Sequence, residues 1–153
     1  AVLCDIFYIG GTKNGALFGE AVVIVNERLK KDFRYMIKHH GGMLAKGRLL
    51  GIQFYELMNG TVFFDLAKHA NAMAQKLQDA FLQLNCPLFV KTTTNQIFPI
   101  FDDEILAEMD KRYACTIWEK VSDHTTAVRI VTSWATKEED VDRYIDDLRR
   151  IMK

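Results

Sequence analysis

The sequence predicts an α+β fold in which helices pack on a small antiparallel sheet. Three observations lead to this prediction. Apolar residues recur with a helical period over much of residues 26–84, short β-like runs fill residues 88–134, and an amphipathic stretch closes the chain. A helix-rich half followed by strands with covering helices is typical of this class. The chain has 153 residues, 49% of them hydrophobic, which is enough to build a real core.

Two strongly apolar runs open the chain. Leu3 to Ile9 and Leu17 to Val25 are each typical of a buried strand, and only Gly19 and Glu20 interrupt the second. Between them lies Gly-Gly-Thr-Lys-Asn-Gly, residues 10–15. Because glycine has no side chain, this turn allows close approach of backbone or of a ligand.

Three helices are expected next. Asn26 is a suitable N-cap for the first, and the paired glycines at 41 and 42 separate it from the second. The expected spans are 27–40, a stretch ending near Met58, and 61–84, before Pro87. Five side chains of the second helix are expected to be buried: Leu49, Leu50, Ile52, Phe54 and Leu57.

The remaining chain predicts four strands and two helices. The strands are expected at 88–90, 96–101, 115–121 and 127–134. A short helix is expected from Asp102-Asp103 to Arg112, and a final one from Lys137 to Met152. Thr136 and Glu139 have the spacing of a capping box for this last helix.

Composition restricts the classes of partner. Twenty basic residues balance twenty acidic ones, so nothing favours nucleic acid or an anionic membrane. No apolar run approaches the ~20 residues that span a bilayer, and no signal-peptide pattern is present. Cys4, Cys86 and Cys115 are widely spaced in apolar surroundings and are expected to be reduced and buried, which favours the cytoplasm. They lack zinc-ligand spacing, so no metal site is predicted.

Lys13 is the first candidate for chemistry. It lies at the tip of the glycine-rich turn, between two elements that hold the turn in place. A lysine that loses its hydration there can act as an amine nucleophile towards a carbonyl carbon. Spacing alone also allows a solvated turn lysine with no chemical role.

Arg129 is the second candidate. It interrupts the apolar strand Ala127-Val128-Arg129-Ile130-Val131, where a buried charge is costly unless it has a partner. A guanidinium can hold a carboxylate through two parallel hydrogen bonds. The alternative is an arginine on the solvent face of a half-buried strand.

Four segments resemble one enzyme family, in that family's order. They are Cys4–Ala21 around the lysine, Gly41–Gly51, Thr94–Phe98 and Val128–Thr132. Together they are similar to the C-terminal half of low-specificity L-threonine aldolases, in the aldolase/β-eliminating-lyase branch of fold-type-I pyridoxal-phosphate enzymes. The lysine segment is specific, and the other three are individually weak.

The resemblance implies a domain division and site roles. Residues 1–25 would end the large cofactor-binding domain, and residues 26–153 would form a helical linker and the small C-terminal domain. Lys13 would bind pyridoxal 5'-phosphate covalently, Thr12 would contact the cofactor phosphate, and Arg129 would hold the substrate α-carboxylate. For Thr12, a simple turn hydrogen bond is equally consistent.

One departure from the family lies after Gly-Gly-Met. Better-known members carry an arginine there, where this chain has Leu44. Whether Lys46 or Arg48 replaces that arginine, at a cofactor or subunit boundary, stays open. Both also fit ordinary surface charges of a helix.

The implied function is cleavage of threonine or allo-threonine-type β-hydroxy-α-amino acids to glycine and an aldehyde, by a cytoplasmic homo-oligomer (dimer or tetramer) of amino-acid metabolism. The chain starts at Ala1 with an apolar strand, so we expect it to be a fragment that is inactive alone. The alternatives are a related β-eliminating lyase or aminotransferase, or a non-catalytic oligomerisation fragment.

Overall fold

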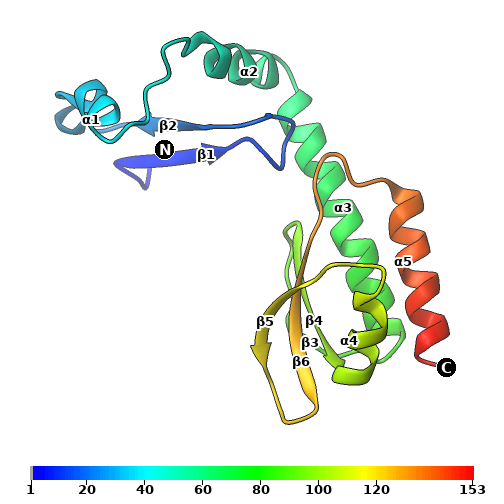
Figure 1. Ribbon diagram of the computed structural model, residues 1–153. Helices are drawn as coiled ribbons and strands as arrows, with labels where there is room; N and C mark the ends of the chain where they lie inside the picture. Colours follow the sequence, from blue (N-terminus) through cyan, green and yellow to red (C-terminus); the bar gives the residue numbers. More distant parts are fainter. Residues whose placement is uncertain (1) are drawn as a thin grey trace. The chain divides into compact units, whose positions relative to one another are not determined.

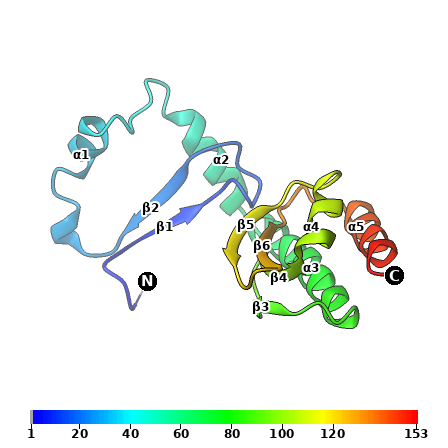
Figure 2. The ribbon, with the colours of Figure 1, turned by 60° about the horizontal axis from the view of Figure 1, so that its bottom comes forward.

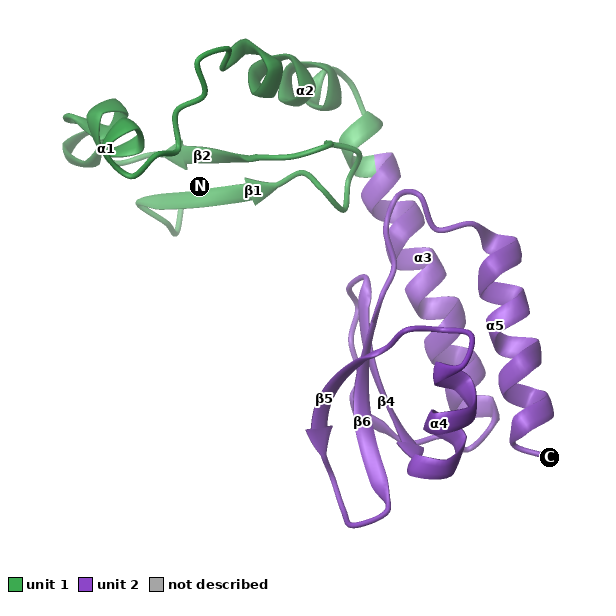
Figure 3. Cartoon of the chain, in the orientation of Figure 1, with its two compact units in different colours: residues 1–64 green, residues 65–153 purple. Residues whose placement is uncertain are grey.

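The computed structural model describes residues 2–153, which form two compact units (Figure 3). The first unit runs to Phe64 and the second begins at Asp65. Each unit is described below by itself. The predicted assignment of residues 1–25 to a cofactor-binding domain and of 26–153 to a linker and small domain stays a prediction.

The first unit is built on a two-stranded antiparallel ribbon. Its strands are β1 (Ile6–Gly10) and β2 (Glu20–Ile24), paired from Ile6 opposite Ile24 to Gly10 opposite Glu20. β2 lies inside the apolar run that predicted it, and β1 extends one residue beyond its run, to Gly10. The prediction that these strands are buried was wrong for the described chain, because a two-stranded ribbon leaves their side chains exposed or half-buried. The register ends with Gly10 opposite Glu20, so residues 11–19 between them form one loop.

The predicted helix over 27–40 is divided in two. The structure has a 3-10 helix, η1 (Glu27–Leu29), and then α1 (Phe33–His39). Asp32 lies between them with a φ of 58°, a left-handed conformation that cannot continue a right-handed helix. No residue of α1 is buried.

The second predicted helix is α2 (Arg48–Met58), and one face of it turns inward. Leu57 is buried, and Leu50 and Phe54 are half-buried. These three residues share one helix face because they are spaced by four and three positions. The prediction that Leu49 and Ile52 are buried was wrong: they lie off this face and are 54% and 55% exposed.

The second unit is an antiparallel sheet with helices on one face (Figures 1 and 2). The sheet has the order β3-β4-β6-β5. Its elements, in chain order, are α3 (Val62–Gln83, which begins in the first unit), β3 (Leu88–Val90), β4 (Gln96–Asp102), α4 (Asp103–Asp110), β5 (Thr116–Lys120), β6 (Thr125–Val131) and α5 (Glu138–Ile151). The predicted α+β class and the order of elements are confirmed.

The core of the second unit lies between the sheet and its helices. Phe81 of α3 is fully buried, and its ring meets Phe101 of β4 and Tyr144 of α5 edge-on at 5.8 and 6.2 Å. Ile97 of β4 and Leu148 of α5 are also completely buried in this core. Alternation along β4 and β6 therefore sends every second side chain to the opposite, open face of the sheet.

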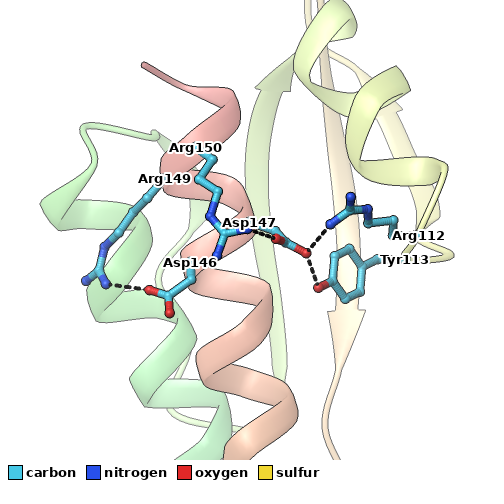
Figure 4. Close-up of polar contacts among 6 residues, drawn as sticks. All are labelled: Arg112, Tyr113, Asp146, Asp147, Arg149 and Arg150. Atoms are coloured by element: carbon cyan, nitrogen blue, oxygen red, sulfur yellow. Dashed lines mark hydrogen bonds and ion pairs between the residues drawn. The ribbon is translucent and has the colours of Figure 1, made fainter.

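A polar cluster joins the end of α4 to α5 (Figure 4). The Asp147 carboxylate accepts hydrogen bonds from the Tyr113 hydroxyl at 2.8 Å and the Arg112 guanidinium at 3.0 Å, and it also pairs with Arg150. Hydrogen bonds from Tyr113 and then Arg112 hold the pKa of Asp147 below its ordinary value. Asp147 is largely buried, so this cluster fixes α5 against the segment that leads into β5.

Two smaller predictions were wrong. The Thr136 hydroxyl accepts a hydrogen bond from the Ser133 amide, outside the helix, and α5 has no side-chain cap at Lys137. Among the cysteines, Cys86 is buried as predicted, but Cys4 is exposed. The three cysteine thiols, including half-buried Cys115, are all free.

Candidate functional site

Lys13 lies at the tip of a compact loop. The Gly11 carbonyl accepts hydrogen bonds from the amides of Asn14 and Ala16, each at 2.9 Å. The first of these closes a four-residue turn in which Lys13 is the third residue. Lys13 and its neighbour Thr12 are exposed, whereas Gly11 and Ala16 at the base of the turn are buried. The predicted setting of Lys13 between two strands, on a glycine-rich turn, is therefore confirmed.

Helix α2 holds this loop in place. The Leu17 amide donates a hydrogen bond of 2.7 Å to Gln53 Oε1, and Gln53 Nε2 donates one of 3.2 Å to the Leu49 carbonyl of the preceding turn. The Gln53 side chain thus links the loop backbone to the helix backbone. Leu50, three residues before Gln53, is its neighbour on the helix surface.

Two glycines allow the loop to approach α2 closely. A Cβ atom at Gly11 would lie 2.6 Å from Ala16 Cβ and 3.0 Å from Phe54 Cζ. A Cβ at Gly19 would lie 2.2 Å from Leu50 Cδ2, and Gly19 has a φ of 88° that other residues rarely adopt. At Gly10 a Cβ would meet nothing within 4 Å. The expectation that glycines of the turn serve close approach is correct for Gly11, and the approaching group is a helix of the same unit. Gly19, for which no such role was expected, meets the same helix.

The segment around Leu44 borders a hollow of the first unit. This hollow has a volume of about 610 Å³, and Leu44, Gly47, Arg48 and Arg34 line it. Lys46 is exposed and does not line it. Arg48 thus lines the same hollow as Leu44, and so does Arg34, a residue that no sequence pattern had singled out.

Arg129 lies on the open face of the sheet in the second unit. Its guanidinium carbon is 6.0 Å from the centre of the Trp118 ring, and the Trp118 and Phe98 rings are 5.0 Å apart. The Arg129 side chain is half-buried, and its Nε atom is buried without a hydrogen-bond acceptor among residues 2–153. A buried N–H donor without a partner is costly, so this site favours a ligand with acceptor oxygens.

These arrangements define two kinds of chemistry. The first unit presents a primary amine on a fixed turn, which suits covalent attachment of a carbonyl compound. The second unit presents a guanidinium flanked by aromatic rings, which suits a planar carboxylate.

Within residues 2–153 there is no cluster of three or more His, Cys, Asp or Glu side chains that could hold a metal ion. No helix in that range is both long and apolar enough to cross a membrane.

Comparisons with known proteins place the chain beside threonine aldolases. It is 28% identical over 153 residues to a low specificity L-threonine aldolase from Pseudomonas sp. (strain NCIMB 10558), covering 97% of this chain and 42% of the relative. It aligns with the structure of Leishmania major threonine aldolase at a TM-score of 0.95 and 40% identity, covering 99% of this chain and 44% of that protein. No protein-family model matches the sequence.

A more distant structure shares the fold. The chain matches SPT, solved with its PLP internal aldimine, at a TM-score of 0.61 and 12% identity, covering 96% of this chain and 39% of that protein. The resemblance to low-specificity L-threonine aldolases is thus confirmed along nearly the whole chain, together with the fold of the C-terminal part of a fold-type-I enzyme. The chain spans less than half the length of the relatives it matches.

Proposed function

We propose that this chain is part of a pyridoxal-phosphate-dependent lyase that cleaves threonine or allo-threonine-type β-hydroxy-α-amino acids to glycine and an aldehyde. The observation that carries the proposal is Lys13, an exposed amine on a turn held by α2, within a segment that resembles the cofactor-lysine segment of threonine aldolases. Pyridoxal phosphate is an aldehyde, and an accessible primary amine is the group that binds it covalently.

Lys13 would hold the cofactor, and its turn would set the direction of the amine. The hydrogen bonds to the Gly11 carbonyl and from Leu17 to Gln53 keep this turn in one conformation. Thr12 is exposed beside Lys13 and has a hydroxyl that can donate to a phosphate oxygen. Bound pyridoxal phosphate supplies the electron sink for breaking the Cα–Cβ bond.

Arg129 would hold the α-carboxylate of the amino acid. Its unpartnered Nε–H and the planar guanidinium match a carboxylate, which accepts two parallel hydrogen bonds. Holding the carboxylate limits rotation of the substrate, which is how a binding group helps to orient the bond that breaks.

The finer assignments rest on the family likeness. We propose that Arg48, beside Leu44, takes the place of the family arginine at a cofactor or subunit boundary, because it lines the hollow there and Lys46 does not.

We further propose a cytoplasmic homodimer or homotetramer. The exposure of Leu17 (81%) and Tyr8 (69%) on the ribbon and its loop agrees with burial of this unit against further protein surface.

The test uses the complete enzyme that contains this chain. Borohydride reduction in the presence of pyridoxal phosphate, followed by peptide mapping, should place the pyridoxyl group on Lys13, and threonine should yield glycine and acetaldehyde in equal amounts. A label on another lysine would overturn the Lys13 assignment. Release of ammonia and a keto acid, or transfer of the amino group, would instead identify a β-eliminating lyase or an aminotransferase.

A further inference from the structure

Trp118 is placed beside Arg129 by an irregularity of the sheet. On β5, Thr116 lies opposite Arg129 and Ile117 opposite Val128, but Glu119 then lies opposite Ala127. The register therefore shifts between Ile117 and Glu119, and Trp118 is the residue at the shift. Such a bulge changes the direction of a side chain relative to a regular strand.

The indole lies over the strand that carries the arginine. The sheet order puts β6 between β5 and β4, and yet the Trp118 ring of β5 meets the Phe98 ring of β4, with an angle of 63° between the two planes. Ala127, on the same open face of β6, is completely buried although it has only a methyl group. The small side chain at Ala127 leaves room for an aromatic ring to cross β6.

The guanidinium of Arg129 lies over the Trp118 ring at 6.0 Å, within the range of a cation–π contact. The ring lies to one side of the guanidinium and limits the orientations that the arginine side chain can adopt. A carboxylate binds edge-on in the guanidinium plane, with both oxygens on N–H donors, so the orientation of that plane sets the orientation of the carboxylate.

We propose that Trp118, supported by Phe98, is a positioning residue that fixes the plane in which Arg129 binds the substrate carboxylate. This inference rests on the proposed function of Arg129. Trp118 does not touch the reacting bond. It acts by reducing the number of orientations that the long arginine side chain must lose when the substrate binds.

The first experiment compares variants of the complete enzyme. Trp118→Leu should raise KM for threonine about five- to tenfold, the range of a partly exposed cation–π contact, with kcat and the absorbance of bound pyridoxal phosphate little changed. Trp118→Phe, which keeps an aromatic face, should restore most of the loss. Phe98→Leu, which leaves the indole without its neighbour, should give an intermediate KM. The matched control is Ile117→Ala, the adjacent residue of the same strand, which is 69% exposed and should leave KM unchanged.

The second experiment separates positioning from general structural support. Threoninamide lacks the charged carboxylate, so Trp118→Leu should weaken threonine binding but leave threoninamide binding within about twofold. A double-mutant cycle with Arg129→Lys should be non-additive, since Trp118 acts through the arginine. Equal weakening of both ligands, or an additive cycle, would overturn the role of Trp118 while leaving Arg129 as the clamp. If Arg129→Lys itself leaves KM unchanged, the proposed clamp is wrong and the role of Trp118 falls with it.

Discussion

A single methyl group at Gly11 should disturb the setting of Lys13. In Gly11→Ala, the new Cβ would lie 2.6 Å from Ala16 Cβ, whereas carbon atoms in ordinary contact are about 3.5–4.0 Å apart. Ala16 is 5% exposed and its amide is bonded to the Gly11 carbonyl, so it cannot move without opening the turn. The ring of Phe54, at 3.0 Å, would also have to shift.

The expected size follows from that overlap. Overpacking by a methyl group in a well-packed place costs about 1–3 kcal/mol. If this cost is met by displacing the turn, the ratio of native to displaced turn falls about five- to 150-fold. Binding of pyridoxal phosphate needs Lys13 in its native direction, so the affinity should fall with the fraction of native turn, by at most that factor.

The assay is a titration of the complete apoenzyme with pyridoxal phosphate, followed by the absorbance of the lysine-bound cofactor. Gly10→Ala is the matched control, because it adds the same methyl group one residue earlier where nothing lies within 4 Å. We expect Gly10→Ala to bind the cofactor as the unmodified enzyme does. Equal affinities for the Gly10 and Gly11 variants would refute the close packing of this loop on α2.

Three further predictions concern the second unit. Arg129→Leu should lower kcat/KM for threonine by roughly two orders of magnitude while the cofactor stays bound, and steady-state assays that give less than a twofold loss would contradict the carboxylate role. Phe81→Ala should reduce the free energy of unfolding by about 3–5 kcal/mol in urea titrations, because it empties a fully buried site, and a loss under 1 kcal/mol would contradict the packing seen there. The carboxylate of Asp147 has its pKa held below 3.8, so its stabilising effect is complete above that pH and disappears as the pH falls through the lowered value. Asp147→Asn should therefore lower the melting temperature at pH 7, by an amount that decreases as the pH falls below 3.8, and a difference that stays constant with pH would argue against the ion pairs.

Much of the fold could be predicted because the patterns are local. The long helix α3 follows from apolar residues at helical spacing, and β4 from a short apolar run that follows a polar turn. The break at Asp32 was missed because apolar residues at helical spacing continue across it, although aspartate adopts the left-handed conformation more readily than most residues. Burial of all five apolar residues of α2 was overestimated because only the face that packs inward is covered.

The candidate site divides in the same way. Lys13 could be found from its glycine-rich turn and family motif, and Arg129 from its charge within an apolar strand. Gln53 could have been suspected only from its place three residues after Leu50, beside the helix face that turns inward. The contact of Trp118 with Arg129 depends on a register shift between strands, and strand register is a property of pairing that the local sequence does not contain.

The buried thiol of Cys86 gives the second unit a built-in reporter of its own opening. Cys86 follows α3, and its Sγ donates to the Ile100 carbonyl of β4 at 3.1 Å, while burial raises its pKa to about 12. The thiolate, which is the form that reacts with alkylating reagents, is therefore scarce at neutral pH unless α3 separates from the sheet. Exposed Cys4 should be alkylated at once and provide the reference. The rate at which Cys86 is alkylated would then measure how often the core opens transiently, without any label added to the protein beforehand.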